Sequence, residues 1–105
     1  MISAIKYGFE ESDIDNVISI FKQNPKISKA VLFGSRAKGN FRNGSDVDIA
    51  LFGNNLCLDD LLEAYGSIEY FNLPYKFDLV IYDRISEQSL KEHIDRVGII
   101  LYTQH

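Results

Sequence analysis

Apolar residues recur along the chain with two different periods, and each period predicts one kind of element. Spacings of three and four residues, as within 14–21, are typical of a helix with one buried face. Short continuous apolar runs, such as 30–33, indicate buried strands. The expected helices cover 12–23, 35–38, 59–71 and 86–97, and the expected strands cover 30–33, 47–52 and 77–82, with 99–102 as a final strand or extended tail.

Small and polar residues punctuate these elements. Ser12 and Ser86 are expected to cap the first turns of two helices, since a hydroxyl can accept from free backbone N–H groups there. Asn24-Pro25 ends the first helix, and Gly98 is a natural C-terminal cap for the last. The alternation of helices and short strands predicts an α/β fold, with helices packed against a small mixed β-sheet.

Length and composition agree with one globular domain. The chain has 105 residues, of which 46% are hydrophobic, so residues 1–105 are expected to form a single domain with a modest core. A chain of this size has little surface left for a large substrate pocket, which favours a partner chain. The net charge of -4 and the pI of about 5.0 exclude a domain-wide basic surface, so direct nucleic-acid binding is not expected.

The cysteine content and the hydropathy pattern limit the kinds of site and the cellular locations that are expected. Cys57 is the only cysteine, which excludes an internal disulfide and a cysteine-rich zinc site. The first ten residues lack the apolar segment of a signal peptide. No apolar run approaches the roughly 20 residues that a membrane helix needs. We therefore expect no membrane association and a cytoplasmic location.

Charge is unevenly distributed in one segment. Between Gly34 and Ser45 the charged residues are Arg36, Lys38 and Arg42, with no acid among them. Two acids, at positions 46 and 48, follow at once. A cationic loop beside an acidic pair suits a phosphate chain and its metal ions. A solvated turn that happens to be basic is the alternative.

The glycine and serine that open this segment are candidates for phosphate binding. Gly34 allows the backbone to approach a ligand closely, and Ser35 offers a hydroxyl together with free backbone N–H groups if it opens a helix. Gly34 and Gly39 are spaced as in a P-loop, but that motif needs Lys-Ser or Lys-Thr after the second glycine. Asn40-Phe41 follows instead, which excludes a P-loop.

Three aspartates are candidate metal ligands. Asp46 and Asp48 are two residues apart, so in a strand their carboxylates point to the same side. Such hard oxygen ligands suit Mg²⁺. Alternatively, Asp46 caps a turn and Asp48 is solvated.

Asp78 interrupts the apolar run 77–81, which the pattern predicts to be fully buried, and a buried carboxylate needs a partner or a metal. On a neighbouring strand it would complete a two-metal site. An ion pair with Arg84 or Lys76, or a position at the sheet edge, is the alternative.

Together these residues resemble a known family. Gly34-Ser35, ten residues and then Asp46-Val47-Asp48 reproduce the signature of the DNA polymerase β-like nucleotidyltransferases. The wider sequence resembles the minimal nucleotidyltransferases (MNT) of prokaryotes, and the resemblance extends over 33–39, 45–50, 77–80 and 94–102.

The resemblance implies a polymerase β-like fold and a role for each residue of the motif. Gly34 and Ser35 would bind the triphosphate, and Arg36 would support its phosphates. Lys38, which stands where many relatives carry arginine, keeps the charge but loses the bidentate fork. The metal and catalytic residues would be Asp46, Asp48 and Asp78: the first two ligate two Mg²⁺ ions, and Asp78 completes the metal site and helps to deprotonate the acceptor hydroxyl.

The resemblance also implies a partner. Minimal nucleotidyltransferases are commonly paired with HEPN toxins, and the chain is similar to antitoxins that transfer AMP from ATP to a tyrosine of the toxin. A hetero-oligomer is then expected. Two alternatives are an antitoxin that neutralises its partner by contact alone and a small-molecule nucleotidyltransferase, which the short chain does not favour. His93, beside Glu92 on the last expected helix, is expected to be a surface residue rather than a ligand.

Overall fold

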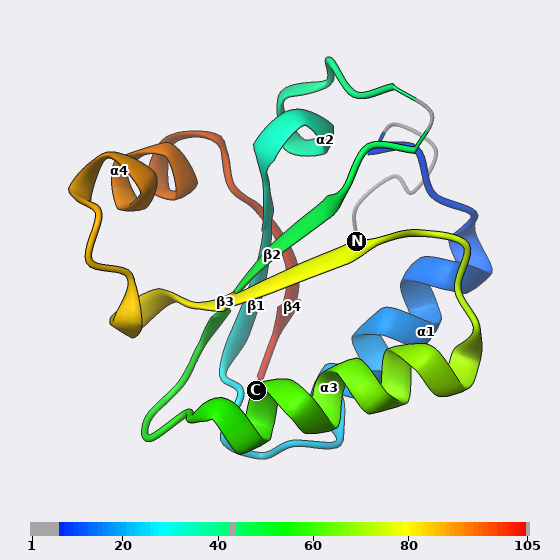
Figure 1. Cartoon of the computed structure of the whole chain (residues 1–105), viewed down its shortest axis with the longest axis horizontal. Helices are drawn as coiled ribbons and strands as arrows, with labels where there is room; N and C mark the ends of the chain where they lie inside the picture. The colour runs from blue at the N-terminus through cyan, green and yellow to red at the C-terminus, as the bar shows by residue number, and fades with distance from the viewer. Residues whose placement is uncertain (1–6, 43, 105) are drawn as a thin grey trace.

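The computed structural model describes residues 7–42 and 44–104, which form an α/β fold (Figure 1). The helices are α1 (Glu11–Lys22), α2 (Gly34–Lys38), α3 (Leu58–Phe71), α4 (Gln88–Val97) and the short 3₁₀ helix η2 (Tyr82–Arg84). The strands are β1 (Lys29–Phe33), β2 (Val47–Phe52), β3 (Phe77–Ile81) and β4 (Ile99–Thr103). None of the helices in these residues is long and apolar enough to cross a membrane.

The four described strands form one mixed sheet in the order β3-β2-β1-β4. Strand β1 runs antiparallel to both β2 and β4, and β3 runs parallel to β2. The parallel pair requires a crossover, which α3 supplies. The mixed sheet and the packed helices confirm the predicted fold class.

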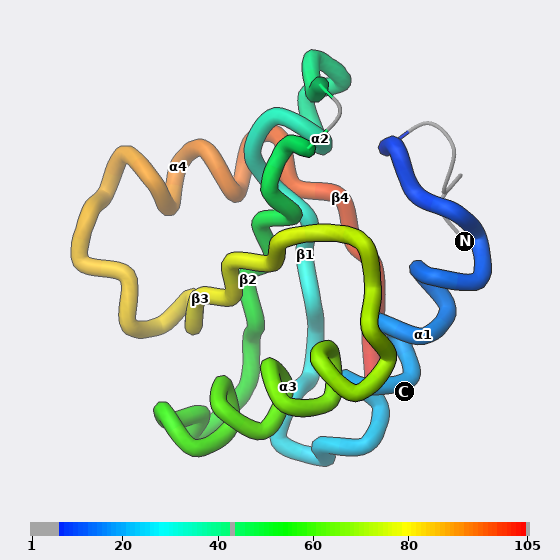
Figure 2. The backbone as a smooth tube through the Cα atoms, turned by 45° about the vertical axis from the view of Figure 1, so that its right-hand side comes forward, coloured from blue at the N-terminus to red at the C-terminus, as the bar shows by residue number. Residues whose placement is uncertain are grey.

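Helices cover the two faces of the sheet unequally. Figures 1 and 2 show α1 and α3 on one side of the sheet and α4 on the other. Alternate residues of β1 point to opposite sides, so Ala30 and Leu32 join the larger core while Val31 and Phe33 join a smaller cluster with Ile94 of α4. The short helix α2 continues directly from the end of β1, so the Gly-Ser turn lies at one end of the sheet.

The helix boundaries differ from the predictions by one or two residues. The N-cap of α1 is Glu10 rather than Ser12, and the N-cap of α4 is Glu87 rather than Ser86. In both helices the side chain of the cap residue makes no capping hydrogen bond to the first turn, so the preference of serine for this position does not decide where the helix starts. Gly98 is confirmed as the residue after α4, where a Cβ would collide with the Ile94 carbonyl.

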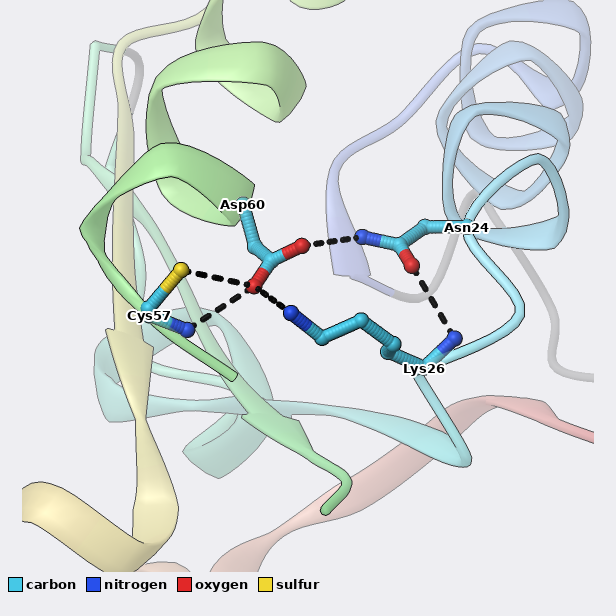
Figure 3. A network of polar contacts seen from close by, with 4 residues as sticks. All are labelled: Asn24, Lys26, Cys57 and Asp60. Carbon is cyan, nitrogen blue, oxygen red and sulfur yellow. Dashed lines mark hydrogen bonds and ion pairs between the residues drawn. The ribbon is translucent and has the colours of Figure 1, made fainter. Parts of the chain in front are cut away.

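A polar network fixes the start of α3 to the loop before β1 (Figure 3). Asp60 accepts hydrogen bonds from the Cys57 backbone N–H (2.8 Å) and from Asn24 Nδ2 (2.9 Å), and it forms an ion pair with Lys26 Nζ (2.7 Å). These contacts hold the pKa of Asp60 well below its usual range, with Lys26 as the largest cause. The network lies at the start of β1, whereas the Gly-Ser turn follows the end of that strand, so the network supports the fold at the other end of the sheet.

Candidate functional site

Three adjacent strands bring the candidate carboxylates together. Phe33 is the register partner of Asp48 across β1 and β2, and Asp48 is the register partner of Asp78 across β2 and β3. Register partners in a sheet place their side chains on the same face. Asp48 and Asp78 therefore lie side by side on the face that α4 covers. Asp46, two residues before Asp48, precedes β2 at the same end of the sheet.

Gly34 lies directly against Asp48. Its φ of 78° is in the left-handed region, and a Cβ at this position would collide with Asp48 Oδ2. Any other residue would be strained and would displace the carboxylate. The Gly-Ser turn and the first carboxylate of β2 therefore form one structural unit, although 13 intervening residues separate Gly34 from Asp48.

The site carries uncompensated negative charge. Burial, together with the nearby charges of Asp78 and Asp46, raises the pKa of Asp48 to about 6. Asp48 is half-buried, whereas Asp46 and Asp78 are exposed. Within residues 7–42 and 44–104, no lysine or arginine forms an ion pair with any of the three. The arrangement therefore favours a cation between the carboxylates.

The chemistry of these donors fits a hard divalent cation. Carboxylate oxygens are the protein ligands that Mg²⁺ prefers, and it usually takes only one or two of them together with phosphate oxygens and water. No group of three or more His, Cys, Asp or Glu side chains in the described residues is arranged to hold a metal ion by itself. Phosphate oxygens would have to complete the ligand set.

The burial predicted for Asp78 is wrong. Strand β3 is at the edge of the described sheet, and Asp78 is exposed. Its apolar neighbours gave a misleading signal because this edge strand is covered mainly on one face. The alternative of an edge position is correct, whereas the described residues contain no ion pair between Asp78 and Arg84 or Lys76. Asp78 remains a candidate site residue because it is the register partner of Asp48.

A family comparison decides the class of the protein. The model for "Polymerase beta, Nucleotidyltransferase" matches residues 15–105, which includes the Gly-Ser turn and all three aspartates. The chain belongs to the polymerase β nucleotidyltransferase family. A comparison with curated proteins finds no match for the sequence.

Solved structures share the nucleotidyltransferase fold of this chain. A chain in the crystal structure of a toxin–antitoxin with AMP-PNP matches with a TM-score of 0.72 at 24% identity, covering 88% of this chain and 74% of that chain. A chain in the structure of a tri-AMPylated Shewanella oneidensis HEPN toxin in complex with an MNT antitoxin matches with a TM-score of 0.66 at 20% identity, covering 90% of this chain and 72% of that chain. At these identities the similarity establishes the fold.

The two predicted phosphate-binding cations occupy different environments. Arg36 is buried, and its guanidinium donates to the backbone carbonyls of Tyr7 (3.0 Å), Gly8 (3.1 Å) and Ser45 (2.9 and 3.2 Å). Its contacts indicate a structural role, and the predicted support of phosphates stays a prediction. Lys38 is exposed at the end of α2.

Sequence reasoning missed one residue that contacts the candidate site. His93 is half-buried, not a surface residue, and its Nε2 accepts a hydrogen bond of 3.2 Å from the Gly34 backbone N–H. Helical spacing could have predicted the partial burial of His93. Position 93 follows Leu90 by three residues and precedes Ile94, so it lies beside the apolar stripe of α4.

Proposed function

We propose that the protein is a Mg²⁺-dependent nucleotidyltransferase that transfers AMP from ATP to a tyrosine hydroxyl of a HEPN toxin, and that it acts as the antitoxin. The observation that carries the proposal is the register of Asp48 with Asp78 beside the Gly34 backbone. It joins two carboxylates to a turn that can receive phosphate, at one end of the sheet. Membership of the nucleotidyltransferase family supports the same chemistry.

The carboxylates have distinct tasks in this proposal. Asp46 and Asp48 would hold two Mg²⁺ ions, and Asp78 would complete the site. When bound, Mg²⁺ supplies the positive charge that offsets the triphosphate and the developing charge in the transition state. Asp78, which is exposed on the edge strand, accepts the proton of the acceptor hydroxyl. The hydroxyl oxygen then bonds to the α-phosphorus, the bond from that phosphorus to the bridging oxygen breaks, and pyrophosphate leaves.

The Gly-Ser turn and Lys38 bind the triphosphate in this proposal. Gly34 and Ser35 begin α2, where backbone N–H groups have no partner within the helix. Lys38 adds a positive charge at the exposed end of the same helix. Arg36 acts indirectly, because its hydrogen bonds to the Ser45 carbonyl hold the segment that leads to Asp46.

The choice of partner rests on solved structures that share the fold and on the exposure of the site. Structures that share the fold include an AMPylated HEPN toxin in complex with an MNT antitoxin and a toxin–antitoxin with AMP-PNP. The exposed aspartates leave the site open to a protein side chain. We therefore propose a HEPN toxin as acceptor, a complex of the two proteins, and a reaction in the cytoplasm.

The direct test measures transfer of label. The protein, Mg²⁺ and ATP labelled at the α-phosphate are incubated with a HEPN toxin encoded beside it, and the toxin is expected to gain label on tyrosine. Asp48→Asn and Asp78→Asn are each expected to lower the rate at least about a hundredfold, the scale for losing a group that acts in the transition state. Removing Mg²⁺ with a chelator is expected to have the same effect.

Asp83→Asn is the matched control, since Asp83 is an exposed acid in η2, soon after Asp78 in the chain. It should retain the wild-type rate. Transfer that persisted in both site variants would contradict the mechanism. A toxin that was neutralised equally by the Asp46→Asn/Asp48→Asn double variant would instead indicate an antitoxin that works by contact alone.

A further inference from the structure

We propose that His93 is a positioning residue for the Gly-Ser turn: it fixes the Gly34 peptide so that the turn can receive the triphosphate. The inference rests on the proposed function, which it extends to a residue outside the signature. His93 belongs to α4 and stands 59 positions after Gly34 in the chain; it reaches the turn from the face that carries Asp48 and Asp78.

The hydrogen bond satisfies an amide that α2 leaves unpaired. Gly34 is the first residue of α2, and the first N–H groups of a helix have no acceptor within it. His93 Nε2 provides the acceptor at 3.2 Å. An imidazole that accepts at Nε2 is neutral and carries its proton on Nδ1. The contact thus requires one particular form of the ring.

The imidazole is itself held in place. Its ring meets the Phe33 ring edge to face, with centroids 6.1 Å apart. The next residue, Ile94, is 2% exposed and packs in the cluster with Val31 and Phe33. At the end of α4, Gly98 lies so close to Val31 that a Cβ would collide with it. His93 is therefore an anchored acceptor, not a side chain that reaches the turn by chance.

Gly34 is consequently fixed on two sides. Its N–H is bound by His93, and its Cα lies against the Asp48 carboxylate. Rotation of the peptide between Phe33 and Gly34 would change the left-handed φ of Gly34, on which the close approach of the turn to Asp48 depends. Without the acceptor, a half-buried N–H loses its partner, and such groups reorient or recruit water. The turn would then bind triphosphate less well, while the carboxylates that perform the chemistry remain.

Two substitutions distinguish the contribution of the hydrogen-bond acceptor from that of the aromatic ring. His93→Phe keeps an aromatic ring against Phe33 but removes the acceptor, whereas His93→Gln keeps an acceptor at a similar reach. For His93→Phe we expect the KM for ATP to rise about tenfold and kcat to change less than about threefold, because the lost interaction serves binding in both ground and transition states. His93→Gln should restore the KM to within about threefold of wild type. Glu92→Gln, at the exposed neighbouring position, is the control.

Amide hydrogen exchange at Gly34, followed by NMR without nucleotide, tests the contact independently of activity. Exchange should accelerate about tenfold in His93→Phe and stay near wild type in His93→Gln. Equal exchange and equal KM in wild type and His93→Phe would overturn the inference, as would equal defects in both variants. Absence of transfer by the wild type would count against the proposed function alone. If His93→Phe did not fold, His93→Met would replace it under the same criteria.

Discussion

At the scale of single residues, the candidate site is arranged for a ligand at some expense to stability. Asp48 is half-buried beside Asp78 and Asp46, and its raised pKa of about 6 reflects both the burial and the like charges. Nothing in the described residues neutralises these carboxylates by an ion pair. Such an arrangement is typical of a functional site, because the same charges that destabilise the free protein favour a bound cation.

Asp48→Asn should stabilise the free protein. The folded pKa of Asp48 is about 6, above the unfolded value, so the ionised carboxylate costs stability. The cost is absent below about pH 4, grows as the pH rises to about 6, and is complete above that. After a discount for solvent screening, we expect the variant to gain about 1–2 kcal/mol in unfolding free energy at pH ~7.5, and about a third of that at pH ~4.5. Urea denaturation at both pH values measures the difference.

The control for this prediction is Asp59→Asn, since Asp59 is an exposed acid in the first turn of α3. Its unfolding free energy should change little with pH relative to wild type. A pH-independent gain in Asp48→Asn would show that packing, rather than charge, limits stability at this position. A loss of stability at neutral pH would contradict the prediction directly.

At the scale of elements, two polar contacts of α3 hold the pieces around the site in register. At its first turn, Asp60 fixes the helix to the loop before β1 (Figure 3). In its middle, the Tyr65 hydroxyl accepts a hydrogen bond of 2.8 Å from the Leu79 N–H. Leu79 follows Asp78 on the edge strand, so this contact helps to hold β3 in place. The helix thus connects the distant end of the sheet to the strand that carries Asp78.

Asp60→Ala should destabilise the protein by about 2 kcal/mol at neutral pH, because a buried carboxylate with several donors is removed. The pKa of Asp60 is held below its usual range, so this contribution is present above the unfolded pKa of about 3.9 and is lost as the pH falls below it. Denaturation at neutral pH and below about pH 4 should therefore show a shrinking difference from wild type. Asp59→Ala is the control, and an equal loss in both variants would refute the special role of Asp60.

Tyr65→Phe should cost about 1 kcal/mol of unfolding free energy, since it removes one hydrogen bond from the Leu79 N–H and leaves the ring in place. The Leu79 amide should exchange with solvent faster in the variant, which NMR can follow. Tyr70→Phe is the matched control, because Tyr70 lies on the same helix and is 85% exposed. Unchanged exchange at Leu79 would mean that the hydroxyl does not hold the edge strand.

At the scale of the whole molecule, the sequence was most informative where a signal was local. Hydrophobic spacing predicted the strands well, and β2 has the predicted bounds 47–52. The spacing of Gly34, Asp46 and Asp48 identified a unit that the fold does bring together around Gly34 and Asp48. Burial of Asp78 was mispredicted because strand order, which makes β3 an edge, is set by contacts distant in sequence.

The contacts of Arg36 and His93 could not be predicted from the sequence, because they too join segments that are apart in the chain. Each makes its deciding contacts with backbone atoms of remote segments: Arg36 with Tyr7, Gly8 and Ser45, and His93 with Gly34. Backbone acceptors and donors are present at every position, so no residue pattern marks the partner. A charged residue within a cationic loop was therefore assigned to phosphate, although the fold uses it to join three segments.

Substitution of Arg36 distinguishes a structural role of this residue from a phosphate-binding role. It is 4% exposed, its guanidinium contacts three backbone carbonyls, and it lies over the rings of Phe9, Phe41 and Tyr75. A lysine cannot span these acceptors, so Arg36→Lys should lower the unfolding free energy by about 2–3 kcal/mol while the KM for ATP of the folded protein changes less than about threefold. Denaturation and steady-state kinetics measure the two effects, with the exposed Arg42→Lys as control. A large rise in KM with unchanged stability would return Arg36 to the phosphate-binding role that the sequence suggested.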